Sequence, residues 1–500
     1  MSASPTAPGR ITHLVGHQSW QGQPGRTSEV YNPATGEVTG TLDLASAETV
    51  DEVVAKAKAA AQEWGHISLA RRVRALFAFR QLLEERKDEI AKAITAEHGK
   101  TYEDAKGEIS RGQEVVEFAC GIPQLLKGGF SEGVSTDVDA FSILQPLGVV
   151  GVISPFNFPA MVPLWFVPIA VATGNTVVIK PSEKDPTAVN LIADLWREAG
   201  VPDGVVNVVH GDKEAVDALL DHTDVKAVSF VGSTPIARYV YERGVAAGKR
   251  VQALGGAKNH MLVLPDADLD LAADAAVNAG FGSAGERCMA ISALVVVEPV
   301  ADELIAKIQD RMGKLVTGDG TRGTDMGPLI TRDALDRVSG FVAGAAGEGA
   351  RVVVDGREVA VPGEGFFIGP SLVDGVTPGM RVYDEEIFGP VLSVVRVASY
   401  DEAVALINAN RYANGTAVFT RDGKTARQFE YDIEVGMVGI NVPIPVPIGA
   451  FSFGGWKDSL FGDTHMYGSE AFNFYTRRKV VTTRWPEPSE SQISLGFPTH

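Results

Sequence analysis

Cysteine is scarce in this chain of 500 residues, which contains only Cys120 and Cys288. Two cysteines cannot build a disulfide framework, so the composition favours a reducing compartment, and we expect a cytoplasmic protein. Neither cysteine has the Cys/His spacing of a metal site, so no bound metal is expected. The N-terminal residues also lack a basic segment followed by an apolar one, so we expect no secretory signal.

Basic charge is in short supply as well. Lys and Arg number 45 against 63 Asp and Glu, which gives a formal net charge of −18. A chain this acidic is repelled by nucleic acid and by anionic lipid unless its basic residues are clustered, and the sequence contains no such cluster. We therefore expect neither a nucleic acid nor a membrane as a partner.

Charged residues are missing from the stretch 140–179, which is long enough to cross a bilayer. A membrane helix would be broken repeatedly by its prolines and would leave backbone groups unpaired in lipid. The stretch therefore predicts buried strand, loop and helix, with a Pro-rich loop ahead of the strand NTVVIK. The five prolines are Pro146, Pro155, Pro159, Pro163 and Pro168.

The periodicity of apolar residues divides the chain into regions. Helical spacing runs through residues 49–126 and includes one helix from Arg71 that Gly99 ends. From Leu147 onward, short β-branched runs alternate with helical ones, and a second such stretch begins near Gly256. This alternation predicts an α/β fold with parallel sheets. The polar tail from Pro486 is expected to wrap a surface or a partner.

Two side chains in loops are candidates for chemistry. Cys288 follows a Gly-rich segment in GSAGERCMA, where the loop can expose its thiol and Arg287 can favour the thiolate. It can also be a small buried hydrophobe, which is our interpretation of Cys120 on its apolar helical face. Asn157 lies between aromatic residues in PFNFP, where its amide can donate to an oxyanion or cap the loop.

Other candidates stand where strands end. Lys180 and Glu183 in KPSE can bind a ribose or phosphate at the end of a parallel strand, although they can also be solvated charges. Gly232 and Ser233 in FVGST lie between a strand and a helix, where a pyrophosphate can bind the helix N-terminus. The usual GxGxxG fingerprint is absent there.

The order of six motifs is more specific than any one of them. PFNFP, KPSE, FVGST, LGGAKN, GERC and EEIFGP occur in an order and spacing that resemble the aldehyde dehydrogenase superfamily, from about Tyr31 to Trp485. The resemblance implies an aldehyde dehydrogenase-like α/β fold that forms a homotetramer. Its parts would be a parallel-sheet NAD-binding domain (1–126 and 147–255), an α/β catalytic domain (256–450), and a small oligomerisation element with the tail (127–146 and 451–500).

The resemblance also implies roles for individual residues. Cys288 would be the nucleophile and Asn157 the oxyanion donor. The residues that would bind NAD are Ser154, Phe156, Lys180, Glu183, Lys184, Gly232, Ser233, Gly255, Glu386 and Phe388. Glu183 would disfavour the 2′-phosphate of NADP through like charge.

One departure from the family pattern bears on the second half of the reaction. Most members carry a Glu in ELGGK that activates water, but the corresponding sequence in this chain is QALGGAKNH. Ala253 or Leu254 takes that place, depending on the alignment, and neither can accept a proton. An acyl-enzyme without this base should await a better nucleophile such as a thiol, unless Glu286 serves as the base instead.

Several segments resemble the methylmalonate-semialdehyde dehydrogenases, the CoA-acylating branch of the family. They are GAKNH, GERCMA, PFNFPAMVPLW, RGQEVVE and TTRWP. The resemblance implies a semialdehyde that bears a carboxylate, bound by Arg111 and Arg287, and oxidised with NAD and CoA to propionyl-CoA or acetyl-CoA with loss of the carboxylate. A hydrolytic aldehyde dehydrogenase and a catalytically idle member that acts as a structural or binding protein are the alternatives.

Overall fold

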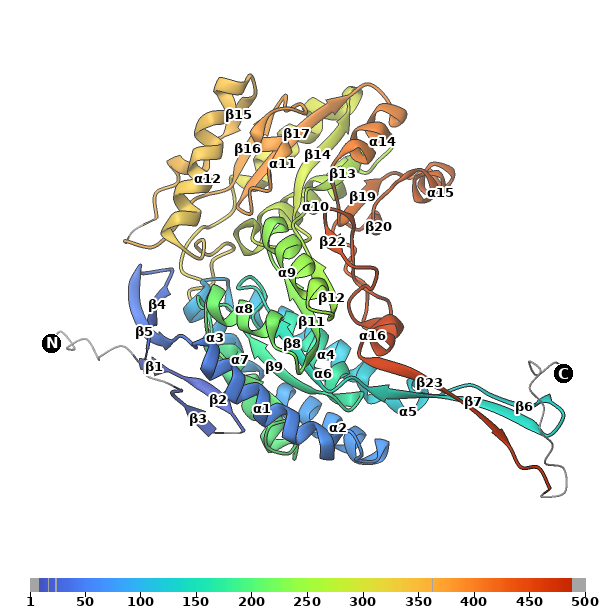
Figure 1. Cartoon of the computed structure of the whole chain (residues 1–500). Helices are drawn as coiled ribbons and strands as arrows, with labels where there is room; N and C mark the ends of the chain where they lie inside the picture. The colour runs from blue at the N-terminus through green and yellow to red at the C-terminus, as the bar shows by residue number, and fades with distance from the viewer. Residues whose placement is uncertain (1–8, 17, 23–24, 362, 488–500) are drawn as a thin grey trace.

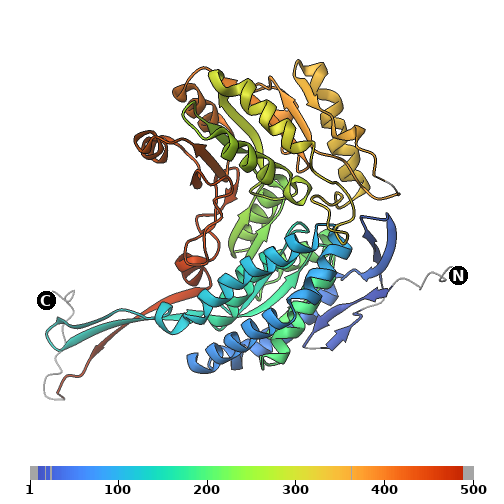
Figure 2. The ribbon, with the colours of Figure 1, turned by 180° about the vertical axis from the view of Figure 1, so that it is seen from behind.

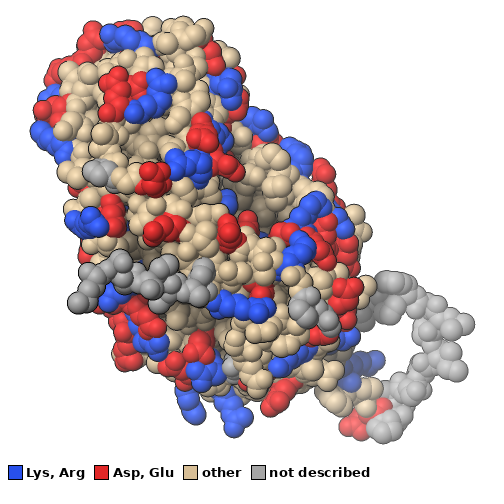
Figure 3. All heavy atoms as spheres, turned by 90° about the vertical axis from the view of Figure 1, so that its left-hand side faces the viewer, with Lys and Arg blue, Asp and Glu red and all other residues tan. Residues whose placement is uncertain are grey.

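Two large sheets with helices around them make up most of the molecule (Figure 1). The computed structural model describes residues 9–16, 18–22, 25–361 and 363–487. Residues 1–8, which begin the segment where no secretory signal is expected, and residues 488–500, which make up most of the polar tail, lie outside these ranges. On the face seen in Figure 3, acidic and basic side chains are interspersed.

The first sheet has eight strands in the order β22-β12-β11-β8-β9-β10-β2-β3. Its central strands from β12 to β10 are parallel, whereas β2, β3 and β22 are added at the edges in antiparallel pairing. The strands are β2 (His13–Val15), β3 (Gln18–Trp20), β8 (Val149–Ile153), β9 (Thr176–Lys180), β10 (Val206–Val208), β11 (Val225–Val231), β12 (Arg250–Leu254) and β22 (Leu460–Phe461).

Helices cover both faces of this sheet. Val149 and Ile153 of β8 point into one core with the first helix group, and Val150 and Val152 point into another core with the second. Every residue of β8 is therefore buried, as expected for a central parallel strand. The first group is α1 (Ala47–Trp64), α8 (Lys213–Asp221) and α9 (Thr234–Ala246). The second is α2 (Leu69–Glu85), α3 (Lys87–His98), α4 (Tyr102–Cys120), α6 (Met161–Ala172) and α7 (Thr187–Glu198).

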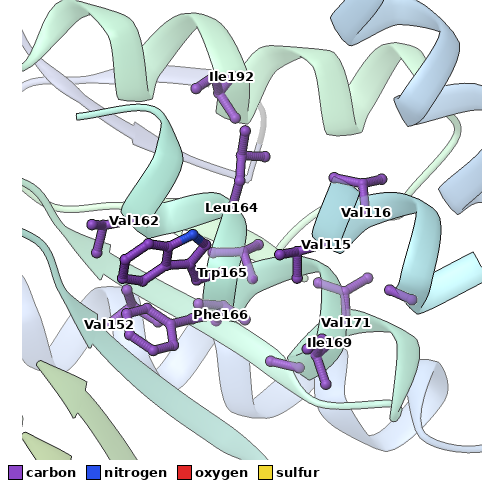
Figure 4. Packing of buried hydrophobic residues seen from close by; sticks show 14 of the residues in the cluster. Val115, Val116, Val152, Val162, Leu164, Trp165, Phe166, Ile169, Val171 and Ile192 are labelled. Carbon is purple, nitrogen blue, oxygen red and sulfur yellow. The ribbon is translucent and has the colours of Figure 1, made fainter. Parts of the chain in front are cut away.

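The charge-free stretch accounts for the centre of the second core. It forms β8, the helix α6 and β9, and every residue of α6 is buried (Figure 4). Trp165 and Phe166 of this helix pack among valines of α4 and β8. A helix that is apolar on all sides is stable only when it is surrounded by other elements, and α6 has that position.

The second sheet has seven strands in the order β15-β16-β17-β14-β13-β19-β20. Its neighbouring pairs are parallel except β15 with β16. The strands are β13 (Asn259–Val263), β14 (Ile291–Val297), β15 (Arg351–Val354), β16 (Ser371–Asp374), β17 (Val391–Val397), β19 (Gly415–Phe419) and β20 (Met437–Ile440). The helices of this half are α10 (Leu269–Phe281), α11 (Ala301–Met312), α12 (Arg332–Ala345), α13 (Arg381–Asp384), α14 (Tyr400–Ala409) and α15 (Gly423–Asp432).

Three smaller sheets complete the structure. One of them combines β6 and β7 with β23 near the C-terminus and projects from the body as a long arm (Figures 1 and 2). Its strands are β6 (Phe130–Ser135), β7 (Val138–Pro146) and β23 (Thr476–Arg484). The second small sheet consists of β1 (Gly9–Ile11), β4 (Thr27–Asn32) and β5 (Glu37–Asp43), and the third of β18 (Tyr412–Ala413) and β21 (Trp456–Lys457). Two short helices are α5 (Ile122–Leu125) and α16 (Gly468–Phe474).

The α/β class with parallel sheets is confirmed, and Cys120 is buried as expected. Most of the stretch 140–179 forms buried strand, loop and helix, as predicted. Its Pro-rich loop is shorter than expected, because α6 takes up Pro168, where complete burial outweighs the loss of one backbone hydrogen bond. One local prediction was wrong: the helix that Gly99 ends is broken at Arg86 into α2 and α3. No helix in the described ranges has the length and apolar character that a membrane span requires.

The close approach of α4 to α6 depends on Gly112. A Cβ added there would lie 2.6 Å from Cδ1 and 2.9 Å from Cβ of Leu164. We expect Gly112→Val to lower the free energy of unfolding by about 1–3 kcal/mol, because the core has no space for the side chain. The measurement is the midpoint of thermal unfolding.

Gly107 of the same helix is the matched control, since a Cβ there meets nothing within 4 Å. Gly107→Val should change stability by less than about 0.5 kcal/mol. Equal losses in the two variants would mean that helix propensity, not the contact with Leu164, decides the outcome.

Candidate active site

A cavity of about 1010 Å³ lies at the carboxyl ends of the strands of the first sheet. Ser154 follows β8, Lys180 ends β9, and Gly232 and Gly255 follow β11 and β12. Ligands of open α/β sheets bind at this edge. The cavity is lined by all twelve residues predicted for catalysis and for NAD, namely Ser154, Phe156, Asn157, Lys180, Glu183, Lys184, Gly232, Ser233, Gly255, Cys288, Glu386 and Phe388.

One end of the cavity carries a buried cation beside a carboxylate. Lys180 is only 6% exposed, and its Nζ lies 3.4 Å from a carboxylate oxygen of Glu183. Burial lowers the pKa of Lys180, and Glu183 partly opposes this. Burial also acts to raise the pKa of Glu183, but Lys180, a backbone hydrogen bond and Lys184 together lower it. Lys180 and Glu183 thus present a donor and an acceptor side by side, as a pair of ribose hydroxyls requires.

The N-terminus of α9 opens onto the same cavity. Ser233 is the N-cap residue, and its side chain makes no capping hydrogen bond. The first N–H groups of a helix lack partners within the helix and attract anions. Gly232 lies beside them, and a Cβ at this position would come within 2.5 Å of the Phe230 ring. This end of the cavity therefore suits a phosphate that approaches the backbone closely.

The loop before β14 holds Cys288 in a constrained backbone. Ser283, Ala284 and Gly285 all have positive φ, at 53°, 51° and 72°. A Cβ on Gly285 would lie 2.3 Å from the carbonyl oxygen of Gly389, so the two loops pack directly on each other. Strained backbone of this kind persists only where the surroundings fix it, and it is common at active sites.

The carbonyl of Cys288 is fixed by two amides. Asn259 Nδ2 donates to it at 2.9 Å and Asn414 Nδ2 at 3.2 Å. These bonds orient the peptide that carries the thiol, and Cys288 lines the cavity. In the sequence Asn259 drew notice only as part of the motif GAKNH, and its position as the first residue of a buried strand was the signal for a structural role.

The thiol of Cys288 is protonated at rest. Burial raises its pKa to about 12, and the neighbouring Glu386 adds to this rise. Backbone N–H groups and Arg287 act in the opposite direction. Arg287 does favour the thiolate, as expected from the sequence, but its influence is smaller than those of burial and Glu386. The nucleophile therefore has to lose its proton during the reaction.

Two acidic side chains share the cavity with this thiol. Glu386 accepts a hydrogen bond from the backbone N–H of Ala257 at 2.9 Å, and burial raises its pKa. Glu286 is 1% exposed, and burial raises its pKa to about 8. Its Oε2 has no hydrogen-bond partner and lies 4.0 Å from Nε2 of His98, which also lacks one. Glu286 is thus a carboxyl group that can exchange a proton near neutral pH.

Arg111 and Arg287 are not among the residues that line this cavity. Arg287 donates to Asp104 at 2.6 Å. Arg111 pairs with Glu114 at 2.7 Å and donates to the carbonyl of Pro447 at 2.9 Å, which also accepts from the Tyr467 hydroxyl at 3.0 Å. Both arginines therefore already have protein partners.

Known proteins with similar sequences agree with this geometry. Residues 20–481 match the pattern of the aldehyde dehydrogenase family. The chain belongs to the aldehyde dehydrogenase family. The resemblance inferred from the six motifs is thereby confirmed.

Several relatives within the family are malonate- or methylmalonate-semialdehyde dehydrogenases. The chain is 54% identical over 496 residues to the malonate-semialdehyde dehydrogenase of Pseudomonas aeruginosa, covering 98% of this chain and 100% of the relative. It is similar to the crystal structure of a methylmalonate-semialdehyde dehydrogenase from Oceanimonas doudoroffii (TM-score 0.95, 53% identity, 96% and 99% of the two chains). A proposed methylmalonate-semialdehyde dehydrogenase from Sinorhizobium meliloti, solved with NAD, has a TM-score of 0.96 at 49% identity, covering 97% of this chain and 100% of that chain.

Several residues of this family member's site were not predicted. Arg337 of α12 lines the cavity. Lys258 is buried and donates to the carbonyls of Val382 and Glu385 at 2.7 and 2.9 Å. Glu385 directly precedes Glu386 in the chain. No local signal distinguishes Arg337 from other charges on its helix, whereas Lys258 stands inside the motif LGGAKN, where a role in the site was open to prediction.

The raised pKa of Cys288 leads to a prediction about thiol reactivity. Below about pH 9 only a small fraction of the thiol is ionised, and this fraction grows tenfold for each pH unit. We expect the rate of alkylation by iodoacetamide to rise about tenfold per unit between pH 7 and pH 9, without a plateau. Cys288→Ala reports the background from Cys120.

The variant Glu386→Gln tests the cause of the raised pKa. It keeps an acceptor for the N–H of Ala257 but removes the negative charge next to the thiol. Alkylation at pH 8 should then be faster than in the unchanged protein. A rate that is already constant at pH 8 in the unchanged protein would contradict a protonated resting thiol.

Proposed function

We propose that this family member oxidises malonate or methylmalonate semialdehyde with NAD and transfers the acyl group to CoA, giving acetyl-CoA or propionyl-CoA with loss of the carboxylate. The proposal rests on the activities that the relatives' names state and on one observation above all. The positions that match the family's base are Ala253 and Leu254, both buried in β12. An acyl group on Cys288 would therefore persist until a thiol arrives.

The cavity suits NAD in its chemistry. Lys180 and Glu183 would hold the adenosine ribose, the N-terminus of α9 with Gly232 and Ser233 would hold the pyrophosphate, and Glu386 with Phe388 would hold the nicotinamide ribose. Ser154, Phe156, Lys184 and Gly255 would contribute the remaining contacts. The buried, unpartnered hydroxyl of Ser154 fits a site that is completed by a ligand. Bound NAD supplies the hydride acceptor.

The protein's own groups carry the first half of the reaction. Cys288 gives up its proton to solvent, and its sulfur adds to the aldehyde carbon as the carbonyl π bond opens onto oxygen. The amide of Asn157 and the backbone N–H of Cys288 donate to the oxyanion that forms. Departure of hydride from the adduct leaves a thioester on Cys288.

The carboxylate of the substrate is then β to a thioester carbonyl. The bond between the carboxylate carbon and the carbon next to the thioester carbonyl breaks, and carbon dioxide leaves. The electron pair of that bond forms the enolate of the thioester, which then takes up a proton on carbon. The same two donors that hold the first oxyanion would stabilise this enolate oxygen. The thiolate of CoA finally takes the acyl group and regenerates Cys288.

We propose Arg111 and Arg287 as the residues that bind the substrate's carboxylate. A guanidinium group binds carboxylates through two parallel hydrogen bonds. Arg287 is adjacent to Cys288 in the chain, and Arg111 shares the carbonyl of Pro447 with Tyr467, whose pKa responds to both Arg111 and Cys288. These contacts support a position of Arg111 near the nucleophile.

We further propose a homotetramer in the cytoplasm, divided into an NAD-binding domain (1–126 and 147–255), a catalytic domain (256–450) and an oligomerisation element (127–146 and 451–500). The exposed apolar side chains of the arm, among them Phe130, Ile143 and Val480, support contact with another subunit. Among the described residues 451–487, β23 is the strand that joins the arm, because β21 pairs with β18 and β22 with β12.

Hydrolysis to a free acid is the second candidate function, and Glu286 favours it. This carboxyl group lines the cavity with Cys288 and has an unpartnered oxygen. Since burial raises its pKa to about 8, it would act as a base for water only when deprotonated, so this activity would rise with pH through about 8.

The decisive measurement is NADH formation from methylmalonate semialdehyde with and without CoA, followed by identification of the product. We expect sustained turnover only with CoA, and propionyl-CoA as the product. Cys288→Ala should abolish it. Equal turnover without CoA, with a free acid formed, would instead establish hydrolysis, and Glu286→Gln should then remove it.

The assignment of Arg111 makes a prediction about specificity. Arg111→Gln should raise the KM for methylmalonate semialdehyde about tenfold or more, because a charge-assisted hydrogen bond contributes about 1.5–3 kcal/mol. The KM for propanal, which has no carboxylate, should be unchanged. Arg80→Gln is the control, since Arg80 pairs with Glu117 on the surface. Equal increases for both aldehydes would mean that Arg111 only shapes the site.

A further inference from the structure

A buried ion pair lies beneath the loop that carries Asn157. Lys100 precedes α4 and Glu108 is inside it, and their side chains approach to 2.6 Å with no exposed surface on either. Neither residue lines the cavity. The pair is therefore part of the support of the loop and does not contact the ligand.

Both members of the pair make hydrogen bonds to the same short segment. Lys100 Nζ donates to the backbone carbonyl of Asn157 at 2.6 Å. It also lies 4.4 Å from the centre of the Phe158 ring. Glu108 Oε1 accepts from the backbone N–H groups of Ala160 and Met161 at 2.9 and 3.2 Å. The segment 157–161 is thus fixed at both ends by one ion pair.

The bonds of Glu108 have a second consequence. Ala160 is the N-cap residue of α6 and has no side chain that can cap the helix. A carboxylate from α4 takes the place of the missing cap and favours the N-terminal end of the helix through its charge. The start of α6, and with it the position of Asn157 three residues earlier, is therefore set by a residue of another helix.

We propose that Lys100 and Glu108 are positioning residues for the oxyanion donor, holding the peptide of Asn157 so that its side-chain amide points at the substrate oxygen. The proposal rests on the role of Asn157 in the proposed function. An oxyanion donor contributes only when it is aimed at the place where the charge develops. Loss of the ion pair should therefore slow the reaction through Asn157.

The test uses Lys100→Met together with Glu108→Gln. This double variant leaves no unpaired charge, and the Gln oxygen still accepts from Ala160 and Met161. The readout is the burst of p-nitrophenolate from p-nitrophenyl acetate, an activated ester that acylates the thiol without NAD or a semialdehyde. If the proposed substrate or the CoA step turned out to be wrong, the burst could therefore still be measured and compared between variants.

We expect the burst rate to fall by about tenfold to a hundredfold in the double variant, somewhat less than the roughly hundredfold to thousandfold loss from removing an oxyanion donor. In an Asn157→Ala background the same two substitutions should lower the rate by less than about threefold, because their effect passes through a side chain that is already gone. Equal losses in both backgrounds would overturn the proposal, since general loosening of the fold does not depend on Asn157. An unchanged rate in the double variant would overturn it as well.

Lys249→Met is the control for removing a buried lysine. Lys249 Nζ donates to the carbonyls of His222 and Val225 at 2.6 and 2.9 Å, and the residue does not line the cavity. It should lower thermal stability without changing the burst rate. If the double variant does not fold, Glu108→Gln alone turns an amide N–H₂ toward Lys100 and gives the same comparison with and without Asn157.

Discussion

The burial of α6 is the constraint on which the first half of the molecule depends. Each residue of this helix is enclosed, so no water can satisfy the N–H groups at its start. Glu108 supplies that partner from α4, and Lys100 neutralises Glu108. An isolated charge in such a core would be very costly, so the two residues stabilise the helix start only as a pair. The core of the sheet and the loop of Asn157 thus share one support.

Low exposure also controls protonation around the cavity. It keeps the thiol of Cys288 protonated, raises the pKa of Glu286 and Glu386, and lowers the pKa of Lys180. All these shifts favour neutral side chains in the absence of a ligand. The charge of a ligand that enters this cavity can shift the pKa values of these groups and thereby change which of them are protonated. The reactivity of the site therefore depends on what is bound as well as on which residues are present.

The sequence was informative where chemistry depends on a short motif. The residues predicted for the nucleophile, the oxyanion donor and the cofactor line one cavity. Lys180, Gly232 and Gly255 stand at the ends of strands whose β-branched pattern is readable, whereas Cys288 and Glu386 lie in loops ahead of β14 and β17 and were found through their motifs. Prediction from the sequence failed where a contact with a distant part of the chain determines the local structure. Nothing near Glu108 in the sequence indicates that it caps a helix more than fifty residues later, and Pro168 inside α6 is tolerated only because the surrounding core holds the helix. The ion pair of Arg287 with Asp104 and the hydrogen bond of Arg111 to the carbonyl of Pro447 were hidden for the same reason.

The strand order of the two large sheets has a consequence for the synthesis of the chain. The second sheet takes all its strands from residues 259–440, whereas the edge strands of the first are β3 (Gln18–Trp20) and β22 (Leu460–Phe461). On the ribosome, the second sheet has all its strands before the first receives β22. Until then β12 is an open edge, and open edges pair readily with other chains. The half of the molecule that is translated first is therefore the half that is completed last.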